Sequence, residues 1–316
     1  MRLLKLVPDN TNIGFVRMRW VAFAVTLVLT LSSIALLMTR GLNLGVDFVG
    51  GLMMEVKFEQ PVKLDELRAT VDGLDYGSSA LQNFGGPDTV LVRLPLPPGD
   101  DAAVQKVVQK VQAAISENHK DASFRRVETV SGKVSDELIR DGIIAIVLSM
   151  GAIALFTWFR FEWHFGVSTI VALIHDVTVT LGFFALTQLE FDLNIVAAVL
   201  TIIGYSLNDK VVIDDRIREN LRKYRQMDIG PLIDLSVNET LSRTYATTMA
   251  LTLALGSLLL LGGDVLFGFT AAMLLGIVIG TYSSVFVSSS LLISLGVGPH
   301  TFAPADTGAA EKVGSR

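Results

Sequence analysis

Acidic side chains inside apolar segments are the residues of this chain whose type and position could do chemistry. Asp209 lies within the apolar run 193–213, in the stretch GYSLNDKVVIDDRIREN of residues 204–220, which ends in dense charge. A charged side chain near the middle of a bilayer costs roughly 2.5–3.5 kcal/mol on insertion scales, so chains seldom carry one without a use for it. The use that this position indicates is proton movement, coupled to work done outside the membrane.

Arg243 is the natural cation for Asp209. It lies in NETLSRTYATT, at the opening of the next apolar run and close to a membrane face. Burial disfavours an ionised carboxylate and a facing cation favours it, so a carboxylate held between the two effects can load and release a proton. If the two helices are neighbours, we expect Arg243 to pair with ionised Asp209. A snorkelling arginine explains the position of Arg243 equally well.

Asp176 lies halfway along a third apolar run, in ALIHDVTVTLGFF. It could belong to the same proton path, or it could be a structural carboxylate that bonds a neighbouring helix, since such bonds are common in membranes and average under about 1 kcal/mol. Adjacent residues on a helix point about 100° apart. We therefore expect no pair between Asp176 and its neighbour His175.

Lys210 and Asp214 are spaced i, i+4, on a different face from Asp209. That spacing predicts that they pair with each other, which lowers the cost of placing Lys210 among apolar residues. The charges that follow, from Asp215 to Lys223, are typical of a solvated amphipathic continuation of the helix.

The composition indicates an integral membrane protein. The 316 residues are 51% hydrophobic with a mean hydropathy of +0.52, too apolar for an ordinary soluble domain. Cysteine is absent, which excludes disulfides, thiolate metal sites and cysteine nucleophiles. No cofactor or metal site and no enzyme activity is expected. Nucleic-acid binding is not expected either, since no basic patch interleaved with aromatic residues lies outside the membrane flanks.

The elements that must position these residues are six apolar runs, each long enough to cross a bilayer. They are predicted at about 16–39, 141–159, 165–186, 193–213, 246–261 and 265–296. Lys and Arg cluster before the first run and between the fourth and fifth, and Arg160 lies between the second and third. The positive-inside rule then places both termini in the cytoplasm and the long segment after the first run outside.

Four regions follow from these runs. Residues 1–40 are a cytoplasmic N-terminus and the first membrane helix, and 41–134 an outer (periplasmic) domain. Residues 135–296 hold the other five membrane helices, and 297–316 are a cytoplasmic tail whose composition is typical of disorder.

The outer segment reads as a small α+β domain. Strand patterns at 50–58, 79–84, 89–94 and 124–130 and helix patterns at 63–71 and 101–117 give the order β-α-β-β-α-β of a ferredoxin-like fold. The segment 133–141 is predicted to be helical and to run into the second span. The domain has no clustered acid–base or nucleophile pattern, so a binding or handling role fits better than catalysis. A passive spacer is the alternative.

Gly276 and Gly280 form a GxxxG pattern on the last span. Small residues let membrane helices approach closely. The pattern fits helix packing, either against a partner membrane protein or within the chain.

Several separate motifs, in order on successive spans, resemble one family. They are GLNLGVDFVGG after the first span, LIHD, TIIGYSLNDKVVIDDRIREN, LSRT and GIVIGTYSSVFVSS. The chain is similar, from Gly14 to about Leu295, to SecF, a family of membrane subunits of the bacterial Sec protein translocase. It departs from the commoner pattern at Lys210, where threonine or serine is frequent, and at Asp214, where an aromatic residue or serine is. The two departures together suggest a compensating pair.

The resemblance implies partners and a mechanism. SecF pairs with SecD to form a permease of the resistance-nodulation-division type, associates with the SecYEG channel and YajC, and uses the proton-motive force to pull unfolded polypeptides outward across the inner membrane. It implies a proton relay of Asp209 and Arg243, and Asp176 matches the acidic residue of the third-span motif. Membrane lipid surrounds the spans and is a further partner. Two other classes stay open. One is a half-unit of a proton-coupled small-molecule or lipid exporter of the same superfamily. The other is a non-conducting scaffold.

Overall fold

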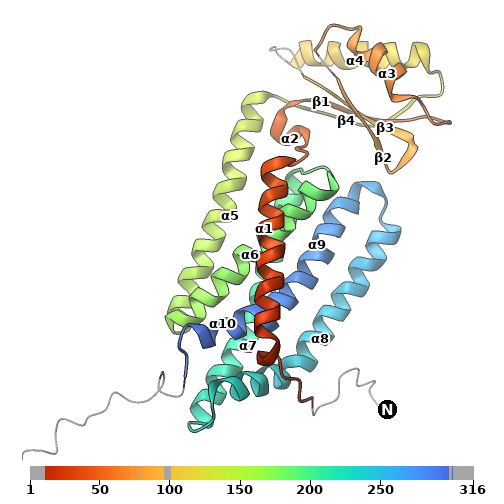
Figure 1. Cartoon of the computed structure of the whole chain (residues 1–316). Coiled ribbons are helices and arrows are strands. Elements are labelled where there is room, and N and C mark those ends of the chain that lie inside the picture. The colour runs from red at the N-terminus through yellow and green to blue at the C-terminus, as the bar shows by residue number, and fades with distance from the viewer. Residues whose placement is uncertain (1–10, 78, 96–100, 299–300, 302–316) are drawn as a thin grey trace, which may run out of the picture.

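Long helices form a bundle with a small sheet domain at one end (Figure 1). The computed structural model describes residues 11–77, 79–95, 101–298 and 301. Within them, six helices are long and apolar enough to cross a membrane. They are α1 (Arg19–Thr39), α5 (Gly132–Arg160), α6 (Trp163–Thr187), α7 (Leu193–Lys223), α8 (Ile229–Leu261) and α9 (Asp264–Tyr282), the last continued by η2 (Ser283–Ser288) and α10 (Ser289–Ser294). The short turn η1 (Val16–Met18) precedes α1. Six spans were predicted, and the membrane-helical fold class is confirmed.

Two of the helices extend further than the apolar runs predict. α7 continues through the charged stretch to Lys223, and α8 begins at Ile229 rather than near residue 246. The extensions are amphipathic, because Ile217 and Leu221 on α7 pack in one buried cluster with Leu232 and Ile233 on α8. The bundle therefore ends in a helical hairpin on the side opposite the sheet. α5 likewise begins well before its apolar part, as the polar helix predicted at 133–141 requires.

The sheet domain has the predicted β-α-β-β-α-β order. Its strands β1 (Gly51–Lys57), β2 (Ala80–Phe84), β3 (Gly86–Leu94) and β4 (Ser123–Val130) form an antiparallel sheet in the order β2-β3-β1-β4. Helices α3 (Leu64–Asp72) and α4 (Asp101–Asn118) lie on its face away from the bundle (Figure 1). Leu67, Val71, Val111 and Ile115 of these helices are buried against the apolar side chains of that face. This is the ferredoxin-like arrangement.

A short connecting segment lies between α1 and β1, and it contains the helix α2 (Val46–Val49), which was not predicted. Val46 of α2 packs against Met53 and Leu91 on the sheet face that α3 and α4 leave uncovered. The chain then turns into β1 through two glycines with positive φ, Gly50 at 74° and Gly51 at 120°. A Cβ on Gly51 would lie 2.5 Å from the Leu94 carbonyl oxygen, so only glycine fits there.

Gly276 and Gly280 face α7 within the chain. A Cβ on Gly276 would lie 2.5 Å from Ile202, and one on Gly280 would lie 3.0 Å from Ser206 Oγ. The missing side chains allow α9 to approach α7 closely, as small residues do between membrane helices. This approach brings the polar end of α9 beside the middle of α7, where Ser206 and Asp209 lie.

Candidate functional site

Three helices bring a group of ionisable and hydroxyl side chains together inside the bundle. α6 supplies Asp176, α7 supplies Ser206 and Lys210, and Ser283 begins the π-helical turn η2. Each of these side chains has 1% or less of its surface exposed. A group this deeply buried must satisfy its charges and hydrogen bonds internally.

Asp176 and Lys210 form a buried ion pair. Lys210 Nζ lies 3.1 Å from Asp176 Oδ2, and it also donates to the hydroxyls of Ser206 and Ser283, 3.1 Å away in the case of Ser283. Both serines donate in turn to the same carboxylate oxygen, Ser283 over 2.9 Å. The ammonium is therefore surrounded by three oxygens on three different elements. Excellent geometry and additional hydrogen bonds of this kind are what a buried ion pair needs to offset its desolvation.

The pair predicted between Lys210 and Asp214 is wrong. Among the described residues, Lys210 ion-pairs with Asp176, while the buried Asp214 accepts a hydrogen bond of 3.4 Å from Thr169 on α6. Side chains on an α-helix lean toward its N-terminus, so the long Lys210 chain runs back toward Ser206 and not forward along α7. Asp176 then lies within its reach.

His175 corrects a second expectation. Its Nδ1 lies 3.1 Å from Asp176 Oδ1, although adjacent helical residues were expected not to pair. The Cα–Cβ bonds of the two residues point about 100° apart, but both side chains bend toward each other, so Nδ1 and Oδ1 come within hydrogen-bonding distance. Asp176 is thereby contacted on both oxygens, by His175 on Oδ1 and by the Lys210 group on Oδ2.

Asp209 has a different environment from Asp176. Thr281 on α9 lies beside its carboxylate. The residue is only 4% exposed, yet Oδ2 has no hydrogen-bond partner within the part of the chain that the structure describes. One buried acid of the bundle is thus fully engaged, and a second, one residue before Lys210, has a free acceptor oxygen.

Arg243 lies on α8 with its side chain exposed. Its charge acts on Asp209, but no ion pair within 4.0 Å joins the two among the described residues. The structure therefore places Arg243 near Asp209 without the direct contact that the sequence suggested. In the same described residues no group of three His, Cys, Asp or Glu side chains could hold a metal ion.

The α6–α7 loop connects the two acid-bearing helices and is hydrogen-bonded to the segment that leads into the sheet domain. The sequence did not predict these contacts. The segment before α2 runs beside this loop: Phe191 N–H donates to the Asn43 carbonyl over 2.8 Å, and Gly45 N–H donates to the Phe191 carbonyl over 2.9 Å. Asp47 of α2 accepts from Leu193 N–H over 3.0 Å, at the first turn of α7. Asp47 and Asn43 lie in the motif GLNLGVDFVGG, the one signal that could have pointed to them.

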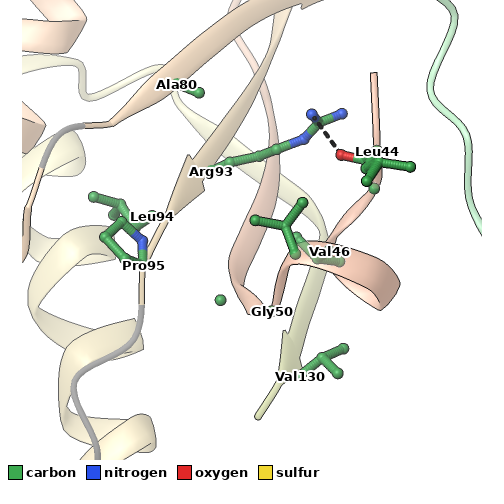
Figure 2. Close-up of a pocket in the computed structure, with 11 residues that line it drawn as sticks. Leu44, Val46, Gly50, Ala80, Arg93, Leu94, Pro95 and Val130 are labelled. Atoms are coloured by element: carbon green, nitrogen blue, oxygen red, sulfur yellow. Dashed lines mark hydrogen bonds between the residues drawn. The ribbon is translucent and has the colours of Figure 1, made fainter. Parts of the chain in front are cut away.

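Arg93 on β3 contacts the same loop from the sheet. The α6–α7 loop, residues 43–47 and Arg93 together form what we call the joint between the bundle and the sheet domain. It donates to Asn43 Oδ1 over 3.0 Å and forms an ion pair of 3.0 Å with Glu190 of the α6–α7 loop. Figure 2 shows Arg93 reaching across to the Leu44 carbonyl at the edge of a cavity of about 410 Å³. The cavity lies between the sheet and the segment 44–51, lined mainly by apolar side chains and glycines.

Glu190 gives this joint a dependence on pH. Burial raises the pKa of the Glu190 carboxyl, and the nearby Asp192 adds to this, although Arg93 opposes both. A folded-state pKa above the unfolded value means that ionisation of the carboxyl destabilises the fold. This loss of stability is complete above the folded-state pKa, shrinks as the pH falls below it, and is absent below the unfolded-state pKa. We expect Glu190→Gln to raise the melting temperature of the purified chain at neutral pH and to leave it unchanged at acidic pH. Glu219→Gln, at an exposed acid, is the matched control, and an equal effect of both changes would contradict the prediction.

The fold and the buried group define a multi-pass membrane protein with a ferredoxin-like domain on one side and ion-paired acids between its helices. The profile described as "Protein export membrane protein SecD/SecF, C-terminal" matches residues 110–297, and that of the "SecD/SecF GG Motif" matches residues 35–62. The chain belongs to the SecF family of protein translocase subunits.

SecF proteins from several bacteria align with this chain over nearly its whole length. The chain is 42% identical to the protein translocase subunit SecF of Cereibacter sphaeroides over 300 residues, 93% of each chain. It is 40% identical to SecF of Vibrio alginolyticus, again over 93% of each. The crystal structure of SecDF from Thermus thermophilus, a translocon-associated membrane protein, matches 92% of the chain with a TM-score of 0.83 and 33% identity. The chain spans only 39% of the length of that SecDF chain.

Proposed function

We propose that this chain pairs with a SecD subunit and uses the proton-motive force to drive late stages of polypeptide export across the inner membrane. The observation that carries the proposal is the buried, unpartnered oxygen of Asp209 beside a fully engaged Asp176–Lys210 ion pair. Asp209 is the proton carrier in this proposal, with Arg243 as the cation that favours its ionised form. Asp176 is the second acid of the relay.

The match to a SecDF structure, of which this chain corresponds to 39%, supports SecD as the partner. The exposed position of Arg243 on α8 fits this, because a partner bundle packed on that helix would bury the arginine and strengthen its attraction to Asp209. SecYEG and YajC are the further partners that the family suggests. The orientation that fits has both ends of the chain in the cytoplasm and the sheet domain in the periplasm.

The joint between the α6–α7 loop and the sheet domain supplies a route from proton to movement. Asp176 and Asp209 lie on the two helices that this loop connects, and Asp47 is bonded directly to the first turn of α7. A change in the packing of α6 against α7 therefore reaches β1 through the segment that carries Asp47. One proton crossing the membrane supplies about 2.3 kcal/mol per 100 mV, enough to bias two packings that differ by a few kcal/mol.

Reconstitution tests the proposal. The chain is placed in vesicles with SecD, SecYEG and the ATP-driven motor that starts translocation. A proton gradient is then imposed, and the completion of a polypeptide already inserted in the channel is followed. We expect the gradient to accelerate completion several-fold and a proton ionophore to remove the acceleration. Proton flux in the same vesicles separates the alternatives. Proton flux without any effect on the polypeptide would favour a small-molecule exporter. The absence of both proton flux and an effect on the polypeptide would favour a scaffold.

A further inference from the structure

A charged surface cavity lies at the end of the bundle opposite the sheet domain, apart from the buried acids. It has a volume of about 570 Å³ and is lined by Arg160, Asp215, Arg218, Glu219, Arg222 and Lys223. Arg160 ends α5, and the other five residues lie on the extension of α7 beyond its apolar part. Four of the six are cations and two are acids, so the lining carries a net charge of two positive units.

The cavity is prearranged by contacts that hold two of its guanidinium groups, those of Arg160 and Arg218. Arg160 donates to Asp215 over 3.1 Å, and Arg218 lies 3.4 Å from Glu162. Both guanidinium groups also lie near the ring of Phe161, at 4.9 Å for Arg160 and 5.9 Å for Arg218. Arginines fixed in this way lose little freedom on binding an anion, and their planar forks match phosphate oxygens.

Two independent observations place the cavity at the level of the lipid headgroups. Asp215 follows the first residue of α7 by 22 positions, a rise of about 33 Å, against a hydrocarbon core of about 30 Å. Around Arg160, Trp158, Phe159 and Trp163 are exposed by 67%, 81% and 50%. Exposed aromatic side chains at a helix end are typical of the interface of a membrane with water.

We propose that this cavity binds the phosphate headgroup of an anionic phospholipid, with the acyl chains lying along the exposed aromatic face at the end of α5. The net positive lining attracts an anionic headgroup and disfavours a zwitterionic one, whose ammonium would meet the same cations. A lipid held between the end of α5 and the extension of α7 ties the α5–α6 turn to the helix that carries Asp209 and Lys210. The site does not depend on the proposed function, because it uses none of the buried acids.

Native mass spectrometry of the delipidated full chain in detergent tests the site, with phosphatidylglycerol and phosphatidylcholine as the probes. We expect phosphatidylglycerol to bind at least tenfold more tightly. Arg222→Gln is expected to weaken phosphatidylglycerol binding about fivefold, because a cation near a lipid surface contributes about 1 kcal/mol. Arg225→Gln is the matched control, since Arg225 is also exposed and lies three residues further along but outside the cavity. We expect it to bind as the wild type does.

Three results would overturn the proposal: equal binding of the two lipids, equal weakening by both substitutions, and displacement of the lipid by glycerol phosphate at the same concentration. The second would assign the attraction to the general surface charge, and the third would assign the cavity to a soluble phosphate compound. Melting curves of the two variants, expected to match the wild type because both side chains are exposed, exclude loss of fold as the cause.

Discussion

Asp209→Asn is expected to abolish the acceleration of export by a proton gradient while the protein inserts into the membrane normally. Asparagine has the size of aspartate, but its amide takes up no proton near neutral pH. Its amide also removes the need to keep a charge in a site that is only 4% exposed. The Asp209 carboxylate forms no ion pair within 4.0 Å in the described part of the chain, so its loss leaves no cation stranded. We therefore expect a loss of at least tenfold in gradient-driven export with an unchanged or slightly higher melting temperature.

Two variants control this experiment. Asp209→Glu keeps a titratable acid at the same place and is expected to retain part of the gradient-driven export. Asp141→Asn removes an acid from α5 whose side chain is 64% exposed, and it is expected to leave export unchanged. Normal late-stage export by Asp209→Asn would refute the assignment of the proton carrier to this residue.

The architecture could be predicted because its signals are local. Apolar runs about 20 residues long specify membrane helices, and alternation and helical periodicity specify the strands and helices of the outer domain. The strand bounds differ by a few residues, since β3 already begins at Gly86 whereas the strand was predicted from residue 89. The tail predicted at 297–316 lies almost entirely outside the described residues.

Elements stabilised by distant contacts were not predictable. α2 has four residues, too short for periodicity, and it exists because Val46 packs against Met53 and Leu91 of the sheet. The early start of α8 depends in the same way on Leu232 and Ile233 meeting the apolar face of the α7 extension. A sequence shows which residues are apolar but not which distant surface they will cover.

The sequence pointed to candidate charged residues but not to how they pair. Asp176, Asp209 and Arg243 were recognisable as charges in or beside apolar runs, which needs no knowledge of the fold. The partner of Lys210 was not, because spacing along one helix suggested Asp214 whereas the packing of α6 against α7 supplies Asp176. Ser283 joins the group where the α9 segment changes to the π-helical turn η2, a local irregularity that is frequent at functional sites.

The coupling between Asp176 and Lys210 should be the strongest pairwise interaction inside the bundle. Lys210→Met leaves the Asp176 carboxylate buried without its cation, and removing one partner of a buried pair typically costs 3–5 kcal/mol, so we expect a loss of about 4 kcal/mol in unfolding free energy. The double change Asp176→Asn with Lys210→Met removes both charges and leaves an amide in place of the carboxylate. It should recover most of that loss, because the amide that replaces the carboxylate is uncharged and can still hydrogen-bond its neighbours. Denaturant unfolding of the purified full chain in detergent measures Lys210→Met, Asp176→Asn and the double variant in one double-mutant cycle.

The same cycle built on Lys210 and Asp214 is the control. Asp214 accepts a hydrogen bond from Thr169 and forms no ion pair with Lys210 among the described residues, so Asp214→Asn with Lys210→Met should be nearly as unstable as Lys210→Met alone. A larger coupling with Asp214 than with Asp176 would contradict the pairing seen here. Export by the stable double variant of Asp176 and Lys210 then separates two roles of this acid. Retained gradient-driven export would make Asp176 a fixed charge that orders α6 against α7, and its loss would place Asp176 in the proton path with Asp209.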